Sequence, residues 1–458
     1  MSAQRIALLA AALALTACSA TTPPRPASTL DIPAAWRTQV GPGALPETAW
    51  WRSFADPALN AVVQRALERN GDLRIAAARL QEYRARVTVA ASGQQPTLSA
   101  GVAPGRARAI GPFGTPVEGT SIQGNLQASY EVDLFGKLAS TTAAARADLQ
   151  SQQALADATA LSVAASTASG YLNLRGLDAQ LELARATLAS RERSLALARR
   201  QFEVGYSSRL DWAQAQAEYH ATAAVVPQLQ RAIEQQENAL AVLAGDSPGT
   251  IARGATLAAL AVPAITPGLP SELLRRRPDI AQAEAAIAAA DAGLAAARAQ
   301  LLPSLHLTAS SGLQAYSVSQ LLRSPTLLWS IGGSVLAPLF DAGRLGAQAD
   351  IAASQRDRAI YAYESVVRNA FAEADNALSG VQRLGEQLAE AAQRRAAAAE
   401  VLRVAHNRYA NGYASYLEEL DAQRNSFSAD VTVLQLRASL LAAHVDLYRA
   451  LGGAWRAA

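Results

Sequence analysis

The side chains that most often carry enzyme chemistry are few and scattered in this sequence. The four histidines, His220, His306, His406 and His444, show no spacing that would bring two of them onto one metal ion. Cys18 is the only cysteine, so neither an intrachain disulfide nor a cluster of thiolate ligands can form. No nucleophile motif and no phosphate-binding loop is found. The sequence therefore predicts a protein that is not an enzyme and that holds no cofactor or metal ion.

The N-terminal residues have the composition of an export signal. Arg5 is followed by an apolar run over residues 6–15 and then by small residues up to Cys18, which is the order of regions in a secretory signal peptide. The apolar run is shorter than the ~18 to 20 residues of a membrane-spanning helix, and no other apolar run reaches that length. We therefore expect residues 1–17 to be removed during export.

Cys18 is the residue at which lipid chemistry is expected. The sequence LTAC, ending at Cys18, resembles the cleavage site of bacterial lipoproteins, in which the cysteine thiol receives diacylglycerol. The alternative is an incidental cysteine in a discarded peptide. Ser19 follows instead of aspartate, which in such signals indicates the outer membrane. Residues 18–30 are rich in Pro, Ser and Thr and predict an extended, lipidated tether.

The charge balance argues against nucleic-acid binding. The sequence has 41 basic and 38 acidic residues, and half of its residues are hydrophobic. The one basic run, RRRPDI at residues 275–280, has no interleaved aromatic residues, and its proline suits the start of a helix. Because the apolar residues are mostly alanine, leucine and valine, and aromatic residues make up only 5%, the composition favours helices.

One segment departs from this helical composition. Residues 121–135, SIQGNLQASYEVDLF, alternate polar and apolar residues without interruption, which predicts a strand with one apolar and one polar face. A soluble sheet that covers a core and a membrane strand that lines a pore both produce this pattern. The segment alone leaves both possibilities open.

The chain contains an internal duplication. The matching pairs are residues 72–96 with 279–303, residues 202–211 with 409–418, and Gly245 with Gly452. Every pair is separated by 207 positions. Three separate matches at one offset predict two structural copies.

Each copy predicts two strands and several long helices. The elements expected in the first copy are a helix over residues 57–92, a strand over about 96–103, a Gly/Pro-rich loop over 104–119, a strand over 121–135, a helix over 137–203 and a helix returning to Gly245. Those expected in the second copy include strands over about 303–313 and 327–340 and a helix over 344–410. A helix of 67 residues is roughly 100 Å long, which no ordinary globular domain needs.

The four predicted strands must be completed by other chains. Four strands cannot close a barrel, and an open sheet leaves backbone groups unpaired in lipid. Two, three or four chains would give eight, twelve or sixteen strands, all even numbers, as a continuous barrel of hairpins requires. The expected fold class is therefore mainly α-helical, with a membrane β-barrel portion assembled from several copies of a helix-strand-strand-helix repeat.

Three motifs, in this order and with this duplication, resemble the TolC-like outer-membrane factor family, in the lipoprotein branch typified by OprM and NodT. They are LPSELLRRRPDIAQAEAAIAAADAGLAAARAQLLPSLHLTASSG at residues 269–312, RYANGYASYLEELDAQR at 408–424 and LYRALGGAW at 447–455. The resemblance spans the chain from Cys18 onward. It implies a homotrimer in which a twelve-stranded outer-membrane barrel continues into a long α-helical barrel in the periplasm.

The resemblance also implies a function and partners. Such trimers are the exit ducts of tripartite efflux pumps in Gram-negative bacteria and passively conduct drugs or other small molecules across the periplasm and outer membrane. A periplasmic membrane-fusion adaptor joins them to an inner-membrane pump of the resistance-nodulation-division (RND) class. The outer-membrane component of a type I protein secretion system has the same architecture, and a helical lipoprotein scaffold without a pore is a further alternative.

The remaining segments are assigned around this plan. Residues 57–245 and 271–458 form the two repeats. Residues 31–56 and 246–270 are left for an equatorial belt around the middle of the helical barrel.

Within the second copy, the resemblance implies a periplasmic gate formed by Asp421, Arg424, Arg408, Tyr409 and Leu417, gathered by threefold symmetry into contacts between chains. The alternative for Asp421 and Arg424, which lie three positions apart, is an ordinary surface ion pair on one helix. The first copy has Gln214 and Ala217 at the matching positions. The implied adaptor-contact residues lie in two turns between helices: Val204, Gly205, Tyr206, Ser207, Gly412, Tyr413 and Ala414.

Overall fold

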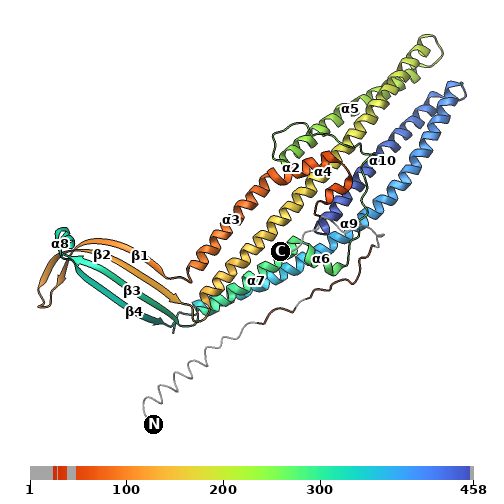
Figure 1. Cartoon of the computed structure of the whole chain (residues 1–458). Helices are drawn as coiled ribbons and strands as arrows, with labels where there is room; N and C mark the ends of the chain where they lie inside the picture. Colours follow the sequence, from red (N-terminus) through yellow and green to blue (C-terminus); the bar gives the residue numbers. More distant parts are fainter. Residues whose placement is uncertain (1–23, 28, 39–47, 454–458) are drawn as a thin grey trace. The chain divides into compact units, whose positions relative to one another are not determined.

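A computed structural model describes residues 24–27, 29–38 and 48–453 of the chain (Figure 1). The expected signal peptide, Cys18 and Trp455 lie outside the described residues. The chain divides into two compact units. Unit 1 comprises the described residues up to Thr29 with residues 79–153 and 282–364, and unit 2 comprises those of 30–78, 154–281 and 365–453.

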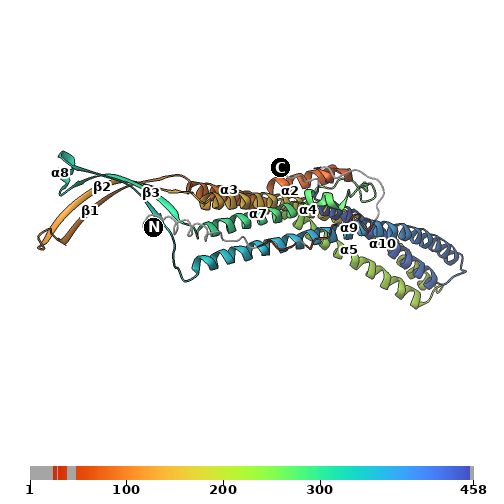
Figure 2. The same ribbon diagram turned by 90° about the horizontal axis from the view of Figure 1, so that it is seen from below.

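The strands of unit 1 form one antiparallel sheet in the order β1-β2-β3-β4, labelled in Figure 1; Figure 2 shows β1, β2 and β3 from below. Their bounds are β1 Thr97–Ile110, β2 Pro116–Val132, β3 Ser304–Ala315 and β4 Thr326–Leu336. The pairs β1–β2 and β3–β4 are the two hairpins that the sequence predicts, and β2 pairs with β3 to join them. A short helix, α8 (Val318–Arg323), lies between β3 and β4.

The predicted loop over residues 104–119 is wrong, because most of it is strand. β1 continues to Ile110 and β2 begins at Pro116, so the turn is only five residues long. Arg106 and Arg108 both contact Glu118 on the neighbouring strand, and such cross-strand pairs stabilise a hairpin that its Gly and Pro content would otherwise weaken.

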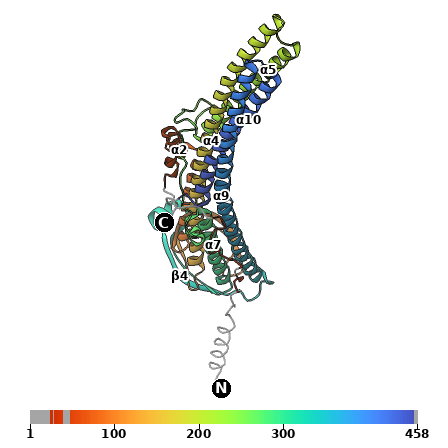
Figure 3. The same cartoon turned by 90° about the vertical axis from the view of Figure 1, so that its right-hand side faces the viewer.

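The long helices agree with the prediction. Both α4 (Lys137–Glu203) and α9 (Arg344–Ala410) have 67 residues. The returning helices, α5 (Arg209–Leu243) and α10 (Tyr416–Ala450), have 35 residues each. Within unit 2, α9 and α10 lie side by side (Figures 1 and 3).

The single helix expected over residues 57–92 is two helices. α2 (Pro57–Arg69) ends before Asn70, whose extended backbone interrupts the helix, and α3 (Gly71–Ser92) follows at once. The Asn70 side chain accepts a hydrogen bond from the Asp72 amide at 2.8 Å, so it caps the new helix. The second copy breaks at the matching residue, Arg277, between α6 (Pro270–Arg276) and α7 (Pro278–Ala299).

Contacts at these two breaks repeat with the sequence offset. The Asn70 side-chain amide donates to the Leu243 carbonyl at 2.9 Å, and the Arg277 guanidinium donates to the Ala450 carbonyl at 3.1 Å. The donor and the acceptor in the second copy each lie 207 positions after their counterparts in the first copy. The duplication is therefore structural, and it fixes how each returning helix ends.

One described helix, α7, is long and apolar enough to cross a membrane by length and composition alone. It is rich in alanine and carries Glu284 and Asp291, and Asp291 pairs with Arg25 within unit 1. These charges make α7 a weak candidate for a span, since buried charge in lipid is costly.

Segments outside the long helices contribute to the core of unit 2. The 3₁₀ helix η1 (Trp50–Phe54) places the Trp50 ring 4.9 Å from that of Tyr448 in a stacked arrangement, and Phe54 is fully buried. Trp36 donates to the Gly268 carbonyl at 2.8 Å. The described parts of residues 31–56 and 246–270 thus pack onto the helices of this unit.

Candidate functional site

The register of the sheet in unit 1 produces one apolar and one polar face. Tyr130 of β2 lies opposite Leu307 of β3, whereas the next residue, Glu131, lies opposite His306. Successive strand residues point to opposite faces. By register, the apolar face contains Leu98, Val102, Leu126, Tyr130, Leu307, Leu313, Trp329, Ile331 and Val335, and the polar face contains Ser99, Gln123, Gln127, Glu131, His306, Thr308, Ser310, Ser330 and Ser334. The two-faced strand predicted over residues 121–135 is confirmed up to Val132, whereas residues 133–135 lie beyond its end.

The apolar face is uncovered and has the height of a membrane core. Trp329 is 72% exposed and Ile331 79% exposed. Along β2 the apolar positions run over residues 122–132, which is ~33 Å of strand, or ~25 Å at the ~40° tilt typical of outer-membrane barrels. Beyond them, Arg106, Arg108 and Glu118 occupy the same face. The change from apolar to charged residues marks one boundary of the apolar band.

The two outer strands leave their edges open. Within the part of the chain that the structure describes, β1 and β4 each pair with one neighbour only. These edges are 14 and 11 residues long. An exposed edge is a template for pairing with another strand, and in lipid its unpaired backbone groups are costly. The sheet is therefore built to be continued by strands from another chain.

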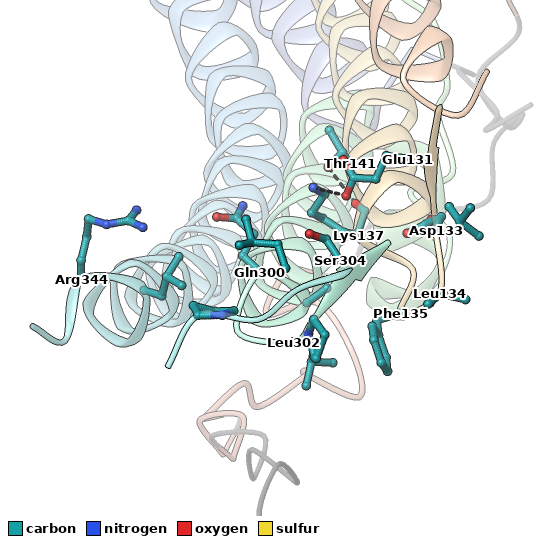
Figure 4. A pocket seen from close by; sticks show the side chains of 16 residues that line it. Glu131, Asp133, Leu134, Phe135, Lys137, Thr141, Gln300, Leu302, Ser304 and Arg344 are labelled. Carbon is teal, nitrogen blue, oxygen red and sulfur yellow. Dashed lines mark hydrogen bonds and ion pairs between the residues drawn. The ribbon is translucent and has the colours of Figure 1, made fainter. Parts of the chain in front are cut away.

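A pocket of about 460 Å³ lies where the strands of unit 1 meet its helices (Figure 4). Lys137 pairs with Glu131 inside it, while Leu134 and Phe135 point away from that pair. The Asp133 carboxylate accepts from the backbone amides of Leu138 and Ala139, at 3.1 and 2.7 Å, and so caps α4. Asp341 caps α9 in the same way, accepting from the Leu345 amide at 2.8 Å. The two strand-to-helix joints are thus held rigidly.

No metal chemistry is indicated in this pocket or elsewhere in the described residues. Among residues 24–27, 29–38 and 48–453, no group of three or more His, Cys, Asp or Glu side chains is placed to hold a metal ion.

The predicted adaptor-contact residues lie in two matching turns of unit 2. Gly205 and Gly412 both have a φ of +77°, which glycine adopts without strain. In each turn the following tyrosine donates its amide to a carbonyl five residues earlier: Tyr206 to Gln201 at 2.7 Å and Tyr413 to Arg408 at 2.8 Å. This is the Schellman arrangement that ends a helix.

The side chains of these turns are offered to solvent. Tyr206 is 89% exposed, Tyr413 78% and Val204 69%, whereas Ser207 and Ala414 are half-buried. Exposed aromatic residues at matching positions of two neighbouring turns are unusual on a surface that binds nothing.

The gate residues predicted in the second copy have partners within the chain. The Arg424 guanidinium lies 2.7 Å from the Glu218 carboxylate of α5, and Arg191 of α4 lies 3.4 Å from the same carboxylate. Asp421 instead accepts a hydrogen bond from the Asn425 side chain at 3.2 Å. The alternative that Asp421 and Arg424 pair on one helix surface is therefore wrong, because Glu218 offers Arg424 a less exposed partner.

Arg408 and Tyr409 also contact neighbouring elements. Arg408 pairs with Glu418 at 3.1 Å, and the Tyr409 hydroxyl donates to the Gln201 side chain of α4 at 3.1 Å. Leu417 is 55% exposed. Each hairpin is thus tied to the other through polar side chains near the turns.

The residues on the other side of these contacts could not be predicted from the sequence. Glu218 and Arg424 are 206 positions apart, and Arg191 belongs to a third helix. Burial lowers the pKa of the Arg191 guanidinium, an effect that Glu218 opposes. Burial also raises the pKa of Tyr416 to about 12. Tyr416 packs in a small cluster with Ala198, Ala215 and Leu420, which joins the two hairpins.

Comparison with known proteins agrees with this arrangement. The sequence model of the outer membrane efflux protein family matches residues 62–246 and 269–453, two segments that again start 207 positions apart. The chain is 33% identical to the pyoverdine export outer membrane protein OpmQ of Pseudomonas putida, over 99% of this chain and 98% of that protein. It is 34% identical to the toluene efflux pump outer membrane protein TtgC of Pseudomonas putida, over 92% and 88%.

Solved structures give the same result. The chain aligns with the open state of the MtrE outer membrane channel of Neisseria gonorrhoeae with a TM-score of 0.85 and 31% identity, covering 95% of this chain and 98% of that one. The family match covers most of the chain in two copies, and the relatives match it over nearly their whole length. The chain belongs to the outer membrane efflux protein family, and it is an outer-membrane efflux channel.

Proposed function

We propose that this protein is the homotrimeric exit duct of a tripartite efflux pump. Three copies would join β4 of one chain to β1 of the next and close a twelve-stranded barrel in the outer membrane. The observation that carries the proposal is the sheet itself, with an uncovered apolar face, a polar face and two open edges. A barrel of eight or sixteen strands would also pair every strand edge, and the resemblance to the family selects twelve strands.

The polar face supports passive conduction. In a closed barrel with its apolar face in lipid, Gln123, Gln127, Ser310 and Ser330 line the lumen. Small uncharged polar groups offer no strong binding site to a passing molecule. The duct therefore conducts whatever molecules the pump delivers, and the pump determines which molecules are exported.

The turns of unit 2 would serve as the gate and the adaptor surface. Arg424 and Tyr409 hold the two hairpins of one chain together, while Arg408 pairs with Glu418 within the second hairpin. Threefold symmetry would place three copies of Asp421 and Leu417 around one axis. Exposed Tyr206 and Tyr413 would then meet the helices of a periplasmic membrane-fusion adaptor, which joins the duct to an inner-membrane RND pump. Acylated Cys18 would add a lipid anchor.

Two measurements test the proposal. Native mass spectrometry of the detergent-extracted protein should give a trimer, and planar bilayers containing it should show discrete conductance steps. A stable monomer or dimer, or a trimer without conductance, would contradict the duct.

A third measurement addresses the pump. Co-expression with its adaptor and RND pump, in a host that lacks its own outer-membrane component, should restore drug tolerance. Export of a large protein substrate without any gain of drug tolerance would support a secretion system instead.

A further inference from the structure

The segment that follows the expected acylation site is bound to the helices of unit 1. The Pro24 carbonyl accepts a hydrogen bond from the Arg356 guanidinium of α9 at 3.0 Å, and Arg25 pairs with Asp291 of α7. Thr29 donates its backbone amide and its hydroxyl to the two oxygens of one carboxylate on α9, at 2.9 and 2.8 Å. Residues 24–27 and Thr29, here called the strap, are extended as expected but are docked on two helices (Figure 1).

Two buried charged side chains hold the strap in place. The carboxylate that binds Thr29 belongs to Glu364, which is 4% exposed, and Arg356 is 1% exposed. A charged group of either kind is stable out of water only when hydrogen-bonding partners replace its hydration. Strap atoms supply one partner to Arg356 and two to Glu364. Arg356 also pairs with Asp357 at 2.8 Å, so loss of the strap would remove one of its several partners and two hydrogen bonds from the buried Glu364 carboxylate.

The chain between Cys18 and the strap has a defined reach. Cys18 precedes Pro24 by six positions. A fully extended chain covers at most ~3.3 to 3.6 Å per residue, and a proline-rich one ~3.1 Å, so the reach is about 20 Å. Arg356 lies twelve positions beyond Arg344, where α9 begins. At 1.5 Å per residue that is ~18 Å of helix.

The start of α9 lies just after the apolar face ends. Leu339 and Phe340, between β4 and α9, are 95% and 91% exposed and continue the apolar surface to the first residues of the helix. The linker from Cys18 is therefore just long enough to bring its lipid from Arg356 back to the base of the apolar face. A linker much shorter than six residues would not reach.

We propose that the strap is a fixed-length tie between α9 and the membrane, which holds the diacylglycerol on Cys18 in the periplasm-facing leaflet beside the base of the barrel. This rests on the acylation included in the proposed function. The strap can stay docked on α9 while the lipid is inserted in the membrane only if the linker spans the ~18 Å of helix between Arg356 and the start of α9. The linker thereby sets an upper limit on the distance between Arg356 and the lipid in the membrane.

The test compares linkers of different length. Deletion of Ala20, Thr21 and Thr22 keeps Ser19 and halves the reach to about 10 Å, whereas a second Ala-Thr-Thr inserted after Thr22 lengthens it. Hydrogen exchange is measured on the peptide that contains the Thr29 amide, in phospholipid nanodiscs and in detergent. The deletion should speed this exchange on the order of tenfold or more in nanodiscs, where strap and lipid compete. It should have no effect in detergent, and the insertion should have none in either medium.

Two controls make the outcome decisive. Glu364→Ala removes the Thr29 acceptor and should speed the exchange in both media, while Glu386→Ala, at an exposed site of α9 paired with Arg383, should not. If the deletion variant fails to accumulate, adding Glu364→Ala should restore it by freeing the strap, and failure to do so contradicts the tie.

The mass of the mature N-terminus separates the possible failures. An acylated deletion variant whose exchange in nanodiscs equals that of the wild type overturns the tie alone. An unacylated wild-type N-terminus overturns both the tie and the lipid anchor, and leaves the duct itself in place.

Discussion

The Tyr171 hydroxyl donates a 2.9 Å hydrogen bond to the Asp56 carboxylate, and both side chains are completely buried. Asp56 also accepts from the backbone amides of Ala58, at 2.8 Å, and Ala255, at 3.1 Å. One carboxylate thus caps α2 and joins it to α4 and to the segment between the two repeats. The contact has no counterpart in the second copy, where Leu378 occupies the position of Tyr171.

Tyr171→Phe should destabilise unit 2 by about 1 to 3 kcal/mol, because a buried carboxylate loses one of its donors. The expected result is a lower apparent melting temperature of the detergent-solubilised protein. Tyr206→Phe is the matched control, since its hydroxyl is exposed in a turn. Equal melting temperatures for the two variants would show that the hydrogen bond contributes nothing.

The same variant gives a pH dependence. Burial raises the pKa of Tyr171 to about 12, whereas an unfolded tyrosine ionises near 10. The neutral side chain therefore contributes its full stability below pH ~10, and that contribution is lost as the pH rises towards ~12. The stability difference between wild type and Tyr171→Phe should shrink over this window in alkaline unfolding experiments. A constant difference would mean that Tyr171 does not titrate in this way.

Two glycine variants should separate backbone strain from close packing. Gly205 and Gly452 both have positive φ, at +77° and +85°. A methyl group at Gly205 meets open space, so Gly205→Ala should cost only the left-handed strain of about 1 to 2 kcal/mol. At Gly452 it would overlap the Arg276 carbonyl, so Gly452→Ala should cost several kcal/mol more. Similar unfolding midpoints for the two variants would contradict the close approach.

Arginine on the two faces of β2 should have different effects. Leu126→Arg places a charge in the middle of the apolar face and should weaken the barrel by about 2 to 4 kcal/mol, seen as loss of heat-resistant oligomer on gels. Gln127→Arg, on the polar face, should leave assembly intact and alter single-channel conductance and ion selectivity. A loss of assembly in both variants would mean that the faces are assigned incorrectly.

Release of Arg424 should widen the duct at the turns. Arg424→Ala removes the 2.7 Å contact between the two hairpins and Glu218→Gln weakens it by removing the charge, so both should raise single-channel conductance without changing oligomer yield, the second by less. Arg383→Ala, which breaks an exposed pair within α9, is the control. An increase with Asp421→Ala but not with Glu218→Gln would shift the closing contact from within one chain to between chains.

Long periodic elements could be predicted from the sequence almost to the residue. α4 and α9 lie in long proline-free stretches, and the matching turn motifs around Gly205 and Gly412 set where each helix ends. Alternation over residues 121–135 likewise identified β2, since only a two-faced strand has period two.

Other features could not be predicted, because they depend on specific side-chain contacts that amino-acid composition does not reveal. Gly and Pro around residue 105 indicated a loop, whereas the ion pairs of Arg106 and Arg108 with Glu118 hold a hairpin there. The helix break at Asn70 depends on a side chain that caps one helix and bonds to the end of another. The pairing of Arg424 with Glu218 could not be predicted, because it joins residues whose proximity only the folded hairpins create.

Lys137, which pairs with Glu131 in the pocket of Figure 4, is the only lysine in the sequence. Apart from the N-terminus, it is therefore the only primary amine on the molecule. An amine-reactive fluorophore would therefore mark one known position at the joint between strands and helices without an engineered cysteine, and the N-terminal amine is the one other site to subtract. Because the Lys137 side chain is 29% exposed, its labelling rate would report how often the ion pair with Glu131 breaks and frees the amine.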